Sequence, residues 1–382
     1  MANTLTNLIP DIYAALDVVS RELVGFIPSA QRDPRAERVA VGQTLRVKQT
    51  PPNAAGADAT PAMAIPAASD QTIGNKSLTI TKNRYFPFSW TGEEQKAVDA
   101  GPGYLTIQQD QIAQAIRAAM NEMESDIALA VKNAASRAYG TAGTTPFAST
   151  LADPANLKKI LDDNGAPVSD RHLVINTTAG AALRTLAQLT KANEAGDTSL
   201  LRQGALLDLH GFMIRESAQV KAHTKGTGAS YQLNGAHAVG ATTLAVDTGT
   251  GTIVAGDVLT IAGGTPADSN KYVVTTALGG GNVVIAAPGL VSSHVDNDAV
   301  TLAANYTGNS AFSRNAVLLA TRLRYIPPEG DLAIDRQIIT DSRTGIPLEF
   351  AIYPGFGMNV YMVAVAWGVS VIKPEHVATL LG

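Results

Sequence analysis

The stretch from Tyr104 to Tyr139 contains neither glycine nor proline, and a glycine stands on each side of it. Thr106 and the glutamine three residues later are spaced as a capping box, and apolar residues then recur at intervals of three and four. The pattern predicts a single helix over residues 106–138, roughly 50 Å long at 1.5 Å per residue. Most globular helices are much shorter, so this helix indicates a spine along an extended subunit. A coiled-coil strand is the alternative, but the segment is unrepeated and rich in alanine.

The segment before this helix predicts a terminal arm. Residues 5–23 have the spacing of a short amphipathic helix, and a proline-bounded stretch separates it from the next apolar segment. We therefore expect residues 1–41 to form an N-terminal arm that docks on a partner, with an ordinary core helix as the alternative. The apolar residues on the predicted face are Ile12, Leu16, Val19 and Leu23.

Residues 42–94 predict an extended loop built as a long hairpin. Polar and apolar residues alternate over 43–49 and again over 76–90, and a tract rich in proline, alanine and glycine separates the two runs. An isolated hairpin is marginal in water, so we expect this one to lie on a neighbouring subunit. The aromatic residues of the second run, which we expect at the assembly interface with the arm residues, are Tyr85, Phe86, Phe88 and Trp90.

The rest of the chain alternates helical and strand-like patterns, with one change of composition. Residues 226–304 hold 13 of the 34 glycines and five aspartates against one lysine, and short strand patterns alternate there with turn signals. This predicts a small all-β barrel inserted into an α/β domain, joined to it by flexible glycine- and threonine-rich boundaries and placed on the outer face. The expected division is a peripheral domain at 95–164, an axial α/β domain at 165–225 and 305–382 with C-terminal strands, and the insertion.

Several functional classes find no support in the residues. The chain has 29 basic and 33 acidic residues and no cysteine, which argues against a basic nucleic-acid stripe, a thiolate nucleophile and a cysteine-bound metal. Motifs for nucleotide binding, zinc hydrolysis and serine hydrolysis are absent, and the six histidines lack the spacing of metal ligands. We expect no catalytic, cofactor-binding or metal-binding residue, no enzyme activity, and no membrane segment, because the apolar run 360–372 is too short to span a bilayer.

Short motifs occur in the same order as these parts, and together they carry a resemblance to a known family. In chain order they are Gly211-Phe212 with Ser217, Asn234-Gly235-Ala236, the run from Gly256 to Gly263, Ala366-Trp367-Gly368-Val369 and Lys373-Pro374-Glu375-His376. The collinear order resembles that of tailed-bacteriophage major capsid proteins, and it is most similar to the coat-protein family of short-tailed Salmonella phages. The likeness spans nearly the whole chain.

The resemblance implies an α+β protein with the capsid fold that tailed phages share with herpesviruses: N-arm, extended loop, long spine helix, axial domain and inserted β barrel. It implies pentamers and hexamers that form an icosahedral shell with the help of scaffolding and portal proteins. Packaged double-stranded DNA would be contacted without sequence specificity, and no cofactor would be needed. The expected location is the virion, after assembly in the cytoplasm of the bacterial host.

Two other functions are consistent with the sequence. An encapsulin-like nanocompartment shell shares the fold but seldom carries such an insertion. A glycan-binding or depolymerising phage protein would use the inserted β domain for recognition, although tyrosines are its sole aromatic residues.

Overall fold

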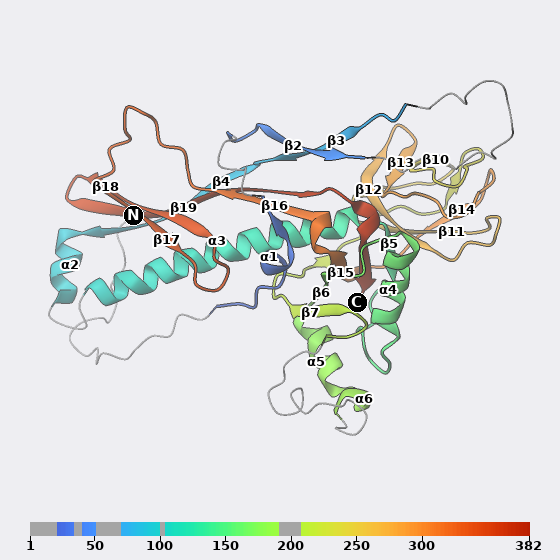
Figure 1. Ribbon diagram of the computed structural model, residues 1–382, viewed down its shortest axis with the longest axis horizontal. Helices are drawn as coiled ribbons and strands as arrows, with labels where there is room; N and C mark the ends of the chain where they lie inside the picture. The colour runs from blue at the N-terminus through green and yellow to red at the C-terminus, as the bar shows by residue number, and fades with distance from the viewer. Residues whose placement is uncertain (1–20, 34–39, 51–69, 100–103, 191–207) are drawn as a thin grey trace, which may run out of the picture.

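The computed structural model describes residues 21–33, 40–50, 70–99, 104–190 and 208–382. The molecule is elongated, and one long helix runs beneath a long twisted sheet (Figure 1). A second sheet and several short helices lie toward the end of the molecule at which the long helix ends (Figure 1). The helices are α1 (Phe26–Ser29), α2 (Gly92–Asp99), α3 (Tyr104–Ala134), α4 (Ala152–Asp163), α5 (Thr177–Thr185), α6 (Ala187–Thr190) and the 3-10 turns η2 (Arg314–Ala316) and η3 (Pro374–His376).

Helix α3 confirms the predicted spine helix. It has 31 residues and is therefore about 46 Å long. It ends at Ala134, short of the predicted residue 138, because the chain turns into strand β5 (Arg137–Tyr139), which pairs with two other strands. Its buried face is formed by Ala119, Met120, Met123, Ile127 and Val131, which belong to the largest apolar core.

This packing predicts the cost of weakening the spine. Ala119 is fully buried, whereas its neighbour Ala118 is exposed on the same helix. Ala118→Gly should lower the free energy of unfolding by about 1 kcal/mol through helix propensity, and Ala119→Gly by about 2 kcal/mol because a buried methyl group is lost as well. Ala119→Pro should cost about 3 kcal/mol or more. Urea titrations measure all three, and equal values for the two glycine variants would contradict the assignment of the buried face.

One face of the first sheet packs on α3. Its strands run in the order β1-β16-β19-β18-β17, and β4 also pairs with β19, at residues 358–367. The sheet and α3 share the largest apolar core, so they form one body. The strands are β1 (Gln31–Arg32), β4 (Lys82–Thr91), β16 (Val317–Arg322), β17 (Asp335–Thr340), β18 (Pro347–Gly355) and β19 (Met358–Val371).

The second sheet joins two groups of strands with separate apolar cores. One group, β5 to β8 with β15 and β20, packs against α4 and α5. The other, β9 to β14, encloses its own core and is attached through the pairing of β12 with β5. Beyond β5, the strands are β6 (Arg171–Ile175), β7 (Phe212–Glu216), β8 (Ala222–His223), β9 (Tyr231–Leu233), β10 (Thr243–Asp247), β11 (Val258–Ile261), β12 (Lys271–Gly279), β13 (Asn282–Ile285), β14 (Ala299–Leu302), β15 (Tyr306–Ser313) and β20 (Val377–Leu381).

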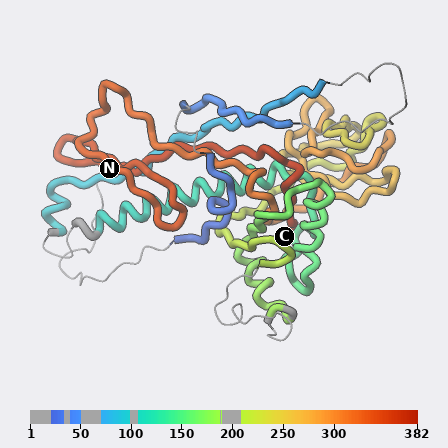
Figure 2. Tube along the Cα trace, in the orientation of Figure 1, coloured from blue at the N-terminus to red at the C-terminus, as the bar shows by residue number. Residues whose placement is uncertain are grey.

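The β9–β14 unit lies at one end of the molecule, beside the C-terminal end of α3 (Figure 2). Its boundaries differ from the loose linkers that the sequence predicts. Gly226 and Gly228 donate backbone hydrogen bonds into the unit, and β15 begins at the buried Tyr306, whose hydroxyl donates to the carbonyl of Gly256 over 2.6 Å. The glycines at these boundaries therefore allow close packing and do not mark a flexible joint.

The extended loop is partly as predicted. Strands β2 (Thr44–Gln49) and β3 (Gly74–Thr79) pair antiparallel over their full length, as a hairpin whose tip, residues 51–69, lies outside the described part of the chain. The predicted second arm at 76–90 is instead two strands. After residues 80–81 the chain leaves the hairpin and enters β4, because the aromatic residues of β4 can be buried against α3 only in the main sheet.

Candidate functional site

The sequence predicts an assembly interface formed by residues of the N-terminal arm and of the extended loop. Of the four arm residues that the sequence singles out, Ile12, Leu16 and Val19 lie outside the described residues, and Leu23 is 49% exposed. The segment that follows is not a free arm. Phe26 and Ile27 are fully buried in the main core and β1 pairs with β16, so the predicted arm 1–41 is too long: residues 25–32 belong to the body of the subunit.

The buried side chain of Glu124 holds this segment on the spine. Glu124 of α3, which has no exposed surface, accepts hydrogen bonds from the backbone N–H groups of Gly25, Phe26 and Ile27 over 2.5, 2.6 and 2.9 Å. Burial raises the pKa of Glu124, and these N–H donors offset part of the increase. The Glu124 carboxyl thus organises the first turn of α1 from the neighbouring helix.

An ion pair at the surface adds to this attachment. Arg117 of α3 donates to Glu22 from both its Nε, over 2.7 Å, and its Nη2. The hydrogen bond from Arg117 and that from Asn121 lower the pKa of Glu22 to about 2 although burial opposes the change. Because both side chains are about a quarter exposed, solvent weakens this pair and its contribution to stability is small.

The four aromatic residues at the predicted interface divide between core and surface. Trp90 is 1% exposed and its Nε1 donates to Gln111 of α3 over 2.7 Å. Phe86 and Phe88 point to the same side and pack against the main core, with Phe88 stacked on Tyr361 at 5.2 Å. Tyr85 faces the other way and is 63% exposed. The alternation along β4 therefore leaves Tyr85 as the aromatic side chain available to a partner.

The hairpin β2–β3 is fixed at its base and exposed along its length. Leu78 and Ile80 are buried against Leu318, Ala320 and Ala366 of the main sheet, and Leu45 and Val47 pack beside them. Most other residues of the two strands are exposed, including the basic side chains of Arg46, Lys48 and Lys76. The two strands of the hairpin are thus mostly exposed and polar, while its base is packed on the main sheet.

A glycine of β19 permits this docking. A Cβ atom built on Gly368 would lie 2.1 Å from the carbonyl oxygen of Thr79 and 2.9 Å from the Cα of Ile80. Both atoms belong to the backbone, so no side-chain rotation could relieve the contact. The hairpin can reach the sheet because position 368 has no side chain.

His294 of the β9–β14 unit and His223 of β8 each contact aspartate side chains. His294 is buried between Asp298, 2.9 Å from Nδ1, and Asp268, 3.3 Å from Nε2. His223 contacts Asp257 over 2.9 Å. Three of the five aspartates of residues 226–304 are therefore paired with histidines and are largely shielded from solvent. Among the described residues, no group of three or more histidine, aspartate or glutamate side chains could hold a metal ion.

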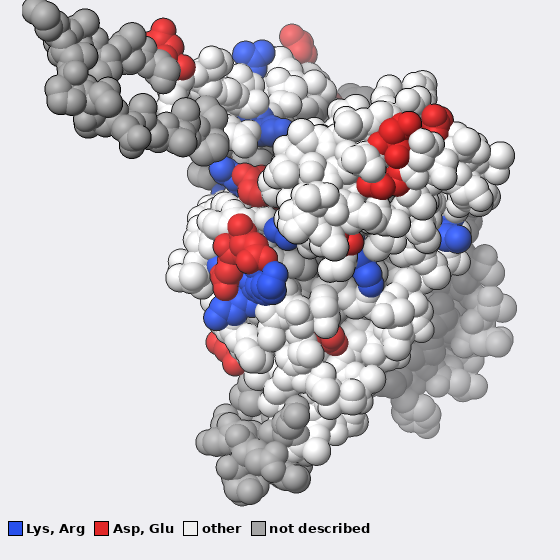
Figure 3. All heavy atoms as spheres, turned by 90° about the vertical axis from the view of Figure 1, so that its right-hand side faces the viewer, with Lys and Arg blue, Asp and Glu red and all other residues white. Residues whose placement is uncertain are grey.

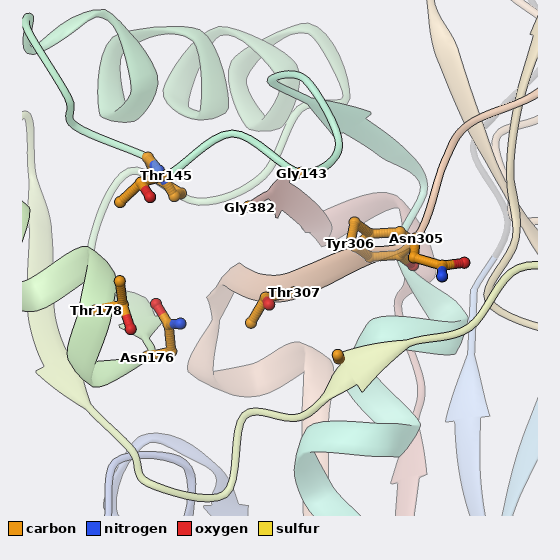
Figure 4. Close-up of a pocket in the computed structure, with 10 residues that line it drawn as sticks. Gly143, Thr145, Asn176, Thr178, Asn305, Tyr306, Thr307 and Gly382 are labelled. Carbon is orange, nitrogen blue, oxygen red and sulfur yellow. The ribbon is translucent and has the colours of Figure 1, made fainter.

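A cavity of about 290 Å³ lies where β15 meets the start of α5 (Figure 4). Asn176 and Thr178 line one side, Thr307 lines another, and the residues around it are uncharged. Asn176 caps α5 with its side chain, and its backbone N–H is bound by Asn309, so these groups serve the fold. No catalytic group is present in this cavity. In the described part of the chain, no helix is both long enough and apolar enough to cross a membrane.

The comparisons with known proteins concern the fold. No protein-family model matches the chain, and no curated protein matches it. A solved chain of Mycobacterium phage Che8 matches with a TM-score of 0.53 and 13% identity, over 99% of this chain and 98% of that one. The capsid structure of cyanophage P-SCSP1u matches with a TM-score of 0.51 and 11% identity, over 100% and 95%.

A third match is to the mature capsid of bacteriophage PhiM1, with a TM-score of 0.51 and 10% identity over 98% of this chain and 91% of that one. These matches give no support to the narrower resemblance to the short-tailed Salmonella phages. At such low identity they bear on the fold, and they cover both chains almost from end to end. This chain therefore has a mixed α/β fold, mostly β, like that of phage capsid proteins.

Proposed function

We propose that this chain is a major capsid protein that self-assembles as pentamers and hexamers into the icosahedral shell around the double-stranded DNA genome of a tailed phage. The observation that carries the proposal is the match over the whole chain to phage capsid structures. A fold can serve more than one function, so the match alone does not decide the matter. The narrower affiliation with coat proteins of short-tailed Salmonella phages rests on short motifs alone.

The shape and surfaces of the subunit support the proposal. The hairpin β2–β3 extends along the main sheet with most of its residues exposed, and Tyr85 adds an exposed aromatic ring to the sheet face. Aromatic side chains are enriched in the buried centres of protein interfaces. An elongated subunit with exposed strands and an exposed ring suits assembly with other copies of itself.

The charge distribution suits a container for DNA. The chain carries a net charge of −4. On the face shown in Figure 3, acidic and basic side chains form small groups, some of which adjoin, and basic side chains form no continuous stripe. Proteins that bind DNA tightly neutralise its phosphates with many lysine and arginine side chains, so we propose that packaged DNA is contacted weakly and without sequence specificity. Scaffolding and portal proteins are the further partners proposed, with assembly in the host cytoplasm and the virion as the final location.

The alternatives are less well supported. A glycan-binding role for the β9–β14 unit needs exposed aromatic rings, but Tyr231 and Tyr272, the aromatic residues of 226–304, are both buried. An encapsulin-like compartment would use the same fold and is distinguished by experiment.

The test is to express the chain in bacteria, alone and with a co-expressed scaffolding protein, and to examine the particles by sedimentation and negative-stain microscopy. We expect closed shells of uniform size, more regular with the scaffold. Tyr85→Ser should reduce the yield of shells several-fold and leave the free energy of unfolding within about 0.5 kcal/mol, because the ring is exposed in the subunit.

Two outcomes would count against the proposal. One is a monomer or small oligomer under every condition, including high protein concentration and the presence of the scaffold. The other is a uniform shell that forms without a scaffold and encloses a specific enzyme, which would favour the compartment. As a matched control, Tyr325→Ser removes a ring that is 74% exposed on the segment between β16 and β17, and it should not reduce assembly as Tyr85→Ser does.

A further inference from the structure

Lys132 is a buried lysine near the C-terminal end of α3, and its amine lies within hydrogen-bonding distance of a histidine. Its side chain is 9% exposed, and its Nζ lies 3.0 Å from Nδ1 of His223 on β8. The two residues are 91 positions apart in the sequence. An amine in hydrogen-bonding contact with an imidazole is the arrangement in which the imidazole can take a proton from the amine.

Asp257 holds His223 in the orientation that this requires. Its Oδ1 lies 2.9 Å from Nε2 of His223, and it is itself fixed by backbone N–H groups of Gly226 and Val254. Because the carboxylate can only accept, Nε2 of a neutral His223 carries the proton, and Nδ1 is left as an acceptor for Lys132. The ring also packs on Tyr306 at 5.1 Å. Lys132, His223 and Asp257 thus form a relay from amine to imidazole to carboxylate.

The surroundings favour the neutral amine. Burial lowers the pKa of Lys132, and the charge of Asp257 offsets part of this decrease. A neutral amine is the nucleophilic form of lysine, and each unit by which the pKa falls raises its fraction at neutral pH roughly tenfold.

The side chain of Lys132 lines a pocket that a small molecule can enter. The pocket has a volume of about 230 Å³, and Ala128, Gly308, Gln219 and Lys221 also line it. Gly308 lies against the stem of Lys132: a Cβ atom there would meet it at 2.9 Å. The pocket holds several non-hydrogen atoms of a ligand but not a macromolecule.

We propose that Lys132 is a site of covalent modification by small aldehydes, with His223 and Asp257 as the groups that promote the reaction. The amine attacks the carbonyl carbon, and a C–N bond forms as the carbonyl π bond opens. One proton from nitrogen passes through Nδ1 of His223, where Asp257 stabilises the transient imidazolium, to the former carbonyl oxygen. That hydroxyl then leaves as water with the second proton from nitrogen, the C–O bond breaks, and a C=N bond forms to give the imine. The reaction consumes one aldehyde and releases one water, and no oxidant is needed. The proposal is independent of shell assembly.

The test treats the unaltered full-length protein with propionaldehyde at pH 7, traps the imine with cyanoborohydride and maps the modified lysines by mass spectrometry. Lys221 is the internal reference, because it lines the same pocket but is exposed. We expect Lys132 to be modified about tenfold faster than Lys221 at pH 7. The ratio should shrink toward pH 10, where ordinary lysines also become neutral.

The relay is tested with His223→Gln, after circular dichroism and thermal melting have shown that the variant is folded. We expect the rate at Lys132 to fall about tenfold and the rate at Lys221 to stay unchanged. Modification of Lys221 with none at Lys132 in the unaltered protein would overturn the proposal, and this comparison stands even if the variant does not fold. An unchanged rate at Lys132 in folded His223→Gln would remove the relay from the proposal.

Discussion

Replacing Gly368 by alanine is expected to detach the base of the β2–β3 hairpin from the main sheet. The new Cβ would lie 2.1 Å from the carbonyl oxygen of Thr79, well inside van der Waals contact, and both it and the neighbouring Cα of Ile80 are backbone atoms. Hairpin and sheet must therefore move apart, which opens the small core around Leu78 and Ile80. We expect a loss of about 3 kcal/mol in the free energy of unfolding, at the upper end for overpacked sites.

Urea denaturation measures the total loss, and amide hydrogen exchange shows where it arises: residues 44–49 and 74–79 should exchange faster while α3 keeps its protection. Gly74→Ala is the matched control. Gly74 lies in β3, and the nearest atom to an added Cβ is 3.9 Å away, so the change should be nearly neutral. Equal stability of the two variants would show that the hairpin does not rest on Gly368. If the hairpin is an assembly surface, Gly368→Ala should also abolish shells.

The parts that periodicity could predict are the long helix and the short strands. The long helix is predictable because its 31 residues contain no glycine or proline and repeat apolar positions at helical spacing. The strands of the β9–β14 unit are predictable because glycine-rich turns separate them. The alternation predicts strands at 242–246, 258–262 and 283–286, and the structure has them at 243–247, 258–261 and 282–285. In these cases local sequence and tertiary structure agree.

The errors occur where tertiary packing overrides the local pattern. The sequence predicts a flexible boundary over residues 303–308, but strand β15 begins at Tyr306 and pairs with β20 and β6 inside the second sheet. Gly308, Asn309 and Ser310 are buried there although they are small or polar. The run 76–90 has one continuous alternation, and nothing in it signals that the chain changes partner at residues 80–81. Sheet membership depends on strands far away in the sequence.

The candidate sites show the same limit more sharply. Alternation on β4 is sufficient to separate Tyr85 from Trp90, but the pattern does not say which face meets the spine. His223 and Asp257 are 34 residues apart and come together only because β8 lies against the turn before β11. The spacing of histidines in the sequence therefore does not reveal that His223 and His294 contact aspartates in the folded protein.

Glu124 is the position where a single side chain is expected to matter most for the N-terminal segment. Its carboxyl accepts from three successive backbone N–H groups, those of Gly25, Phe26 and Ile27, and has no exposed surface. Helix α1 is a single turn, so its own carbonyl groups cannot accept hydrogen bonds from its first N–H groups. The contact fixes Phe26, which stacks on Phe312 at 6.1 Å in the main core.

Glu124→Ala should lower the free energy of unfolding by on the order of 4 kcal/mol, because it leaves three buried donors without an acceptor. Glu124→Gln should cost about half as much, since its amide oxygen still accepts while its NH₂ group faces donors. Urea titrations at pH 7 measure both. Glu122→Gln is the matched control on the same helix: its pairs with Lys82 and Arg84 are partly exposed, so the expected loss is below about 1 kcal/mol.

The pH dependence gives an independent check of the Glu124 carboxyl. Its pKa is raised above the ordinary value of 4.5, so the folded protein binds this proton more tightly than the unfolded chain does. The stabilisation that follows is complete below pH 4.5 and is lost as the pH rises through the folded pKa. The advantage of the unaltered protein over Glu124→Gln should therefore decrease from acid to neutral pH. An advantage that increases over this range would show that the three N–H donors outweigh burial and hold the carboxylate ionised.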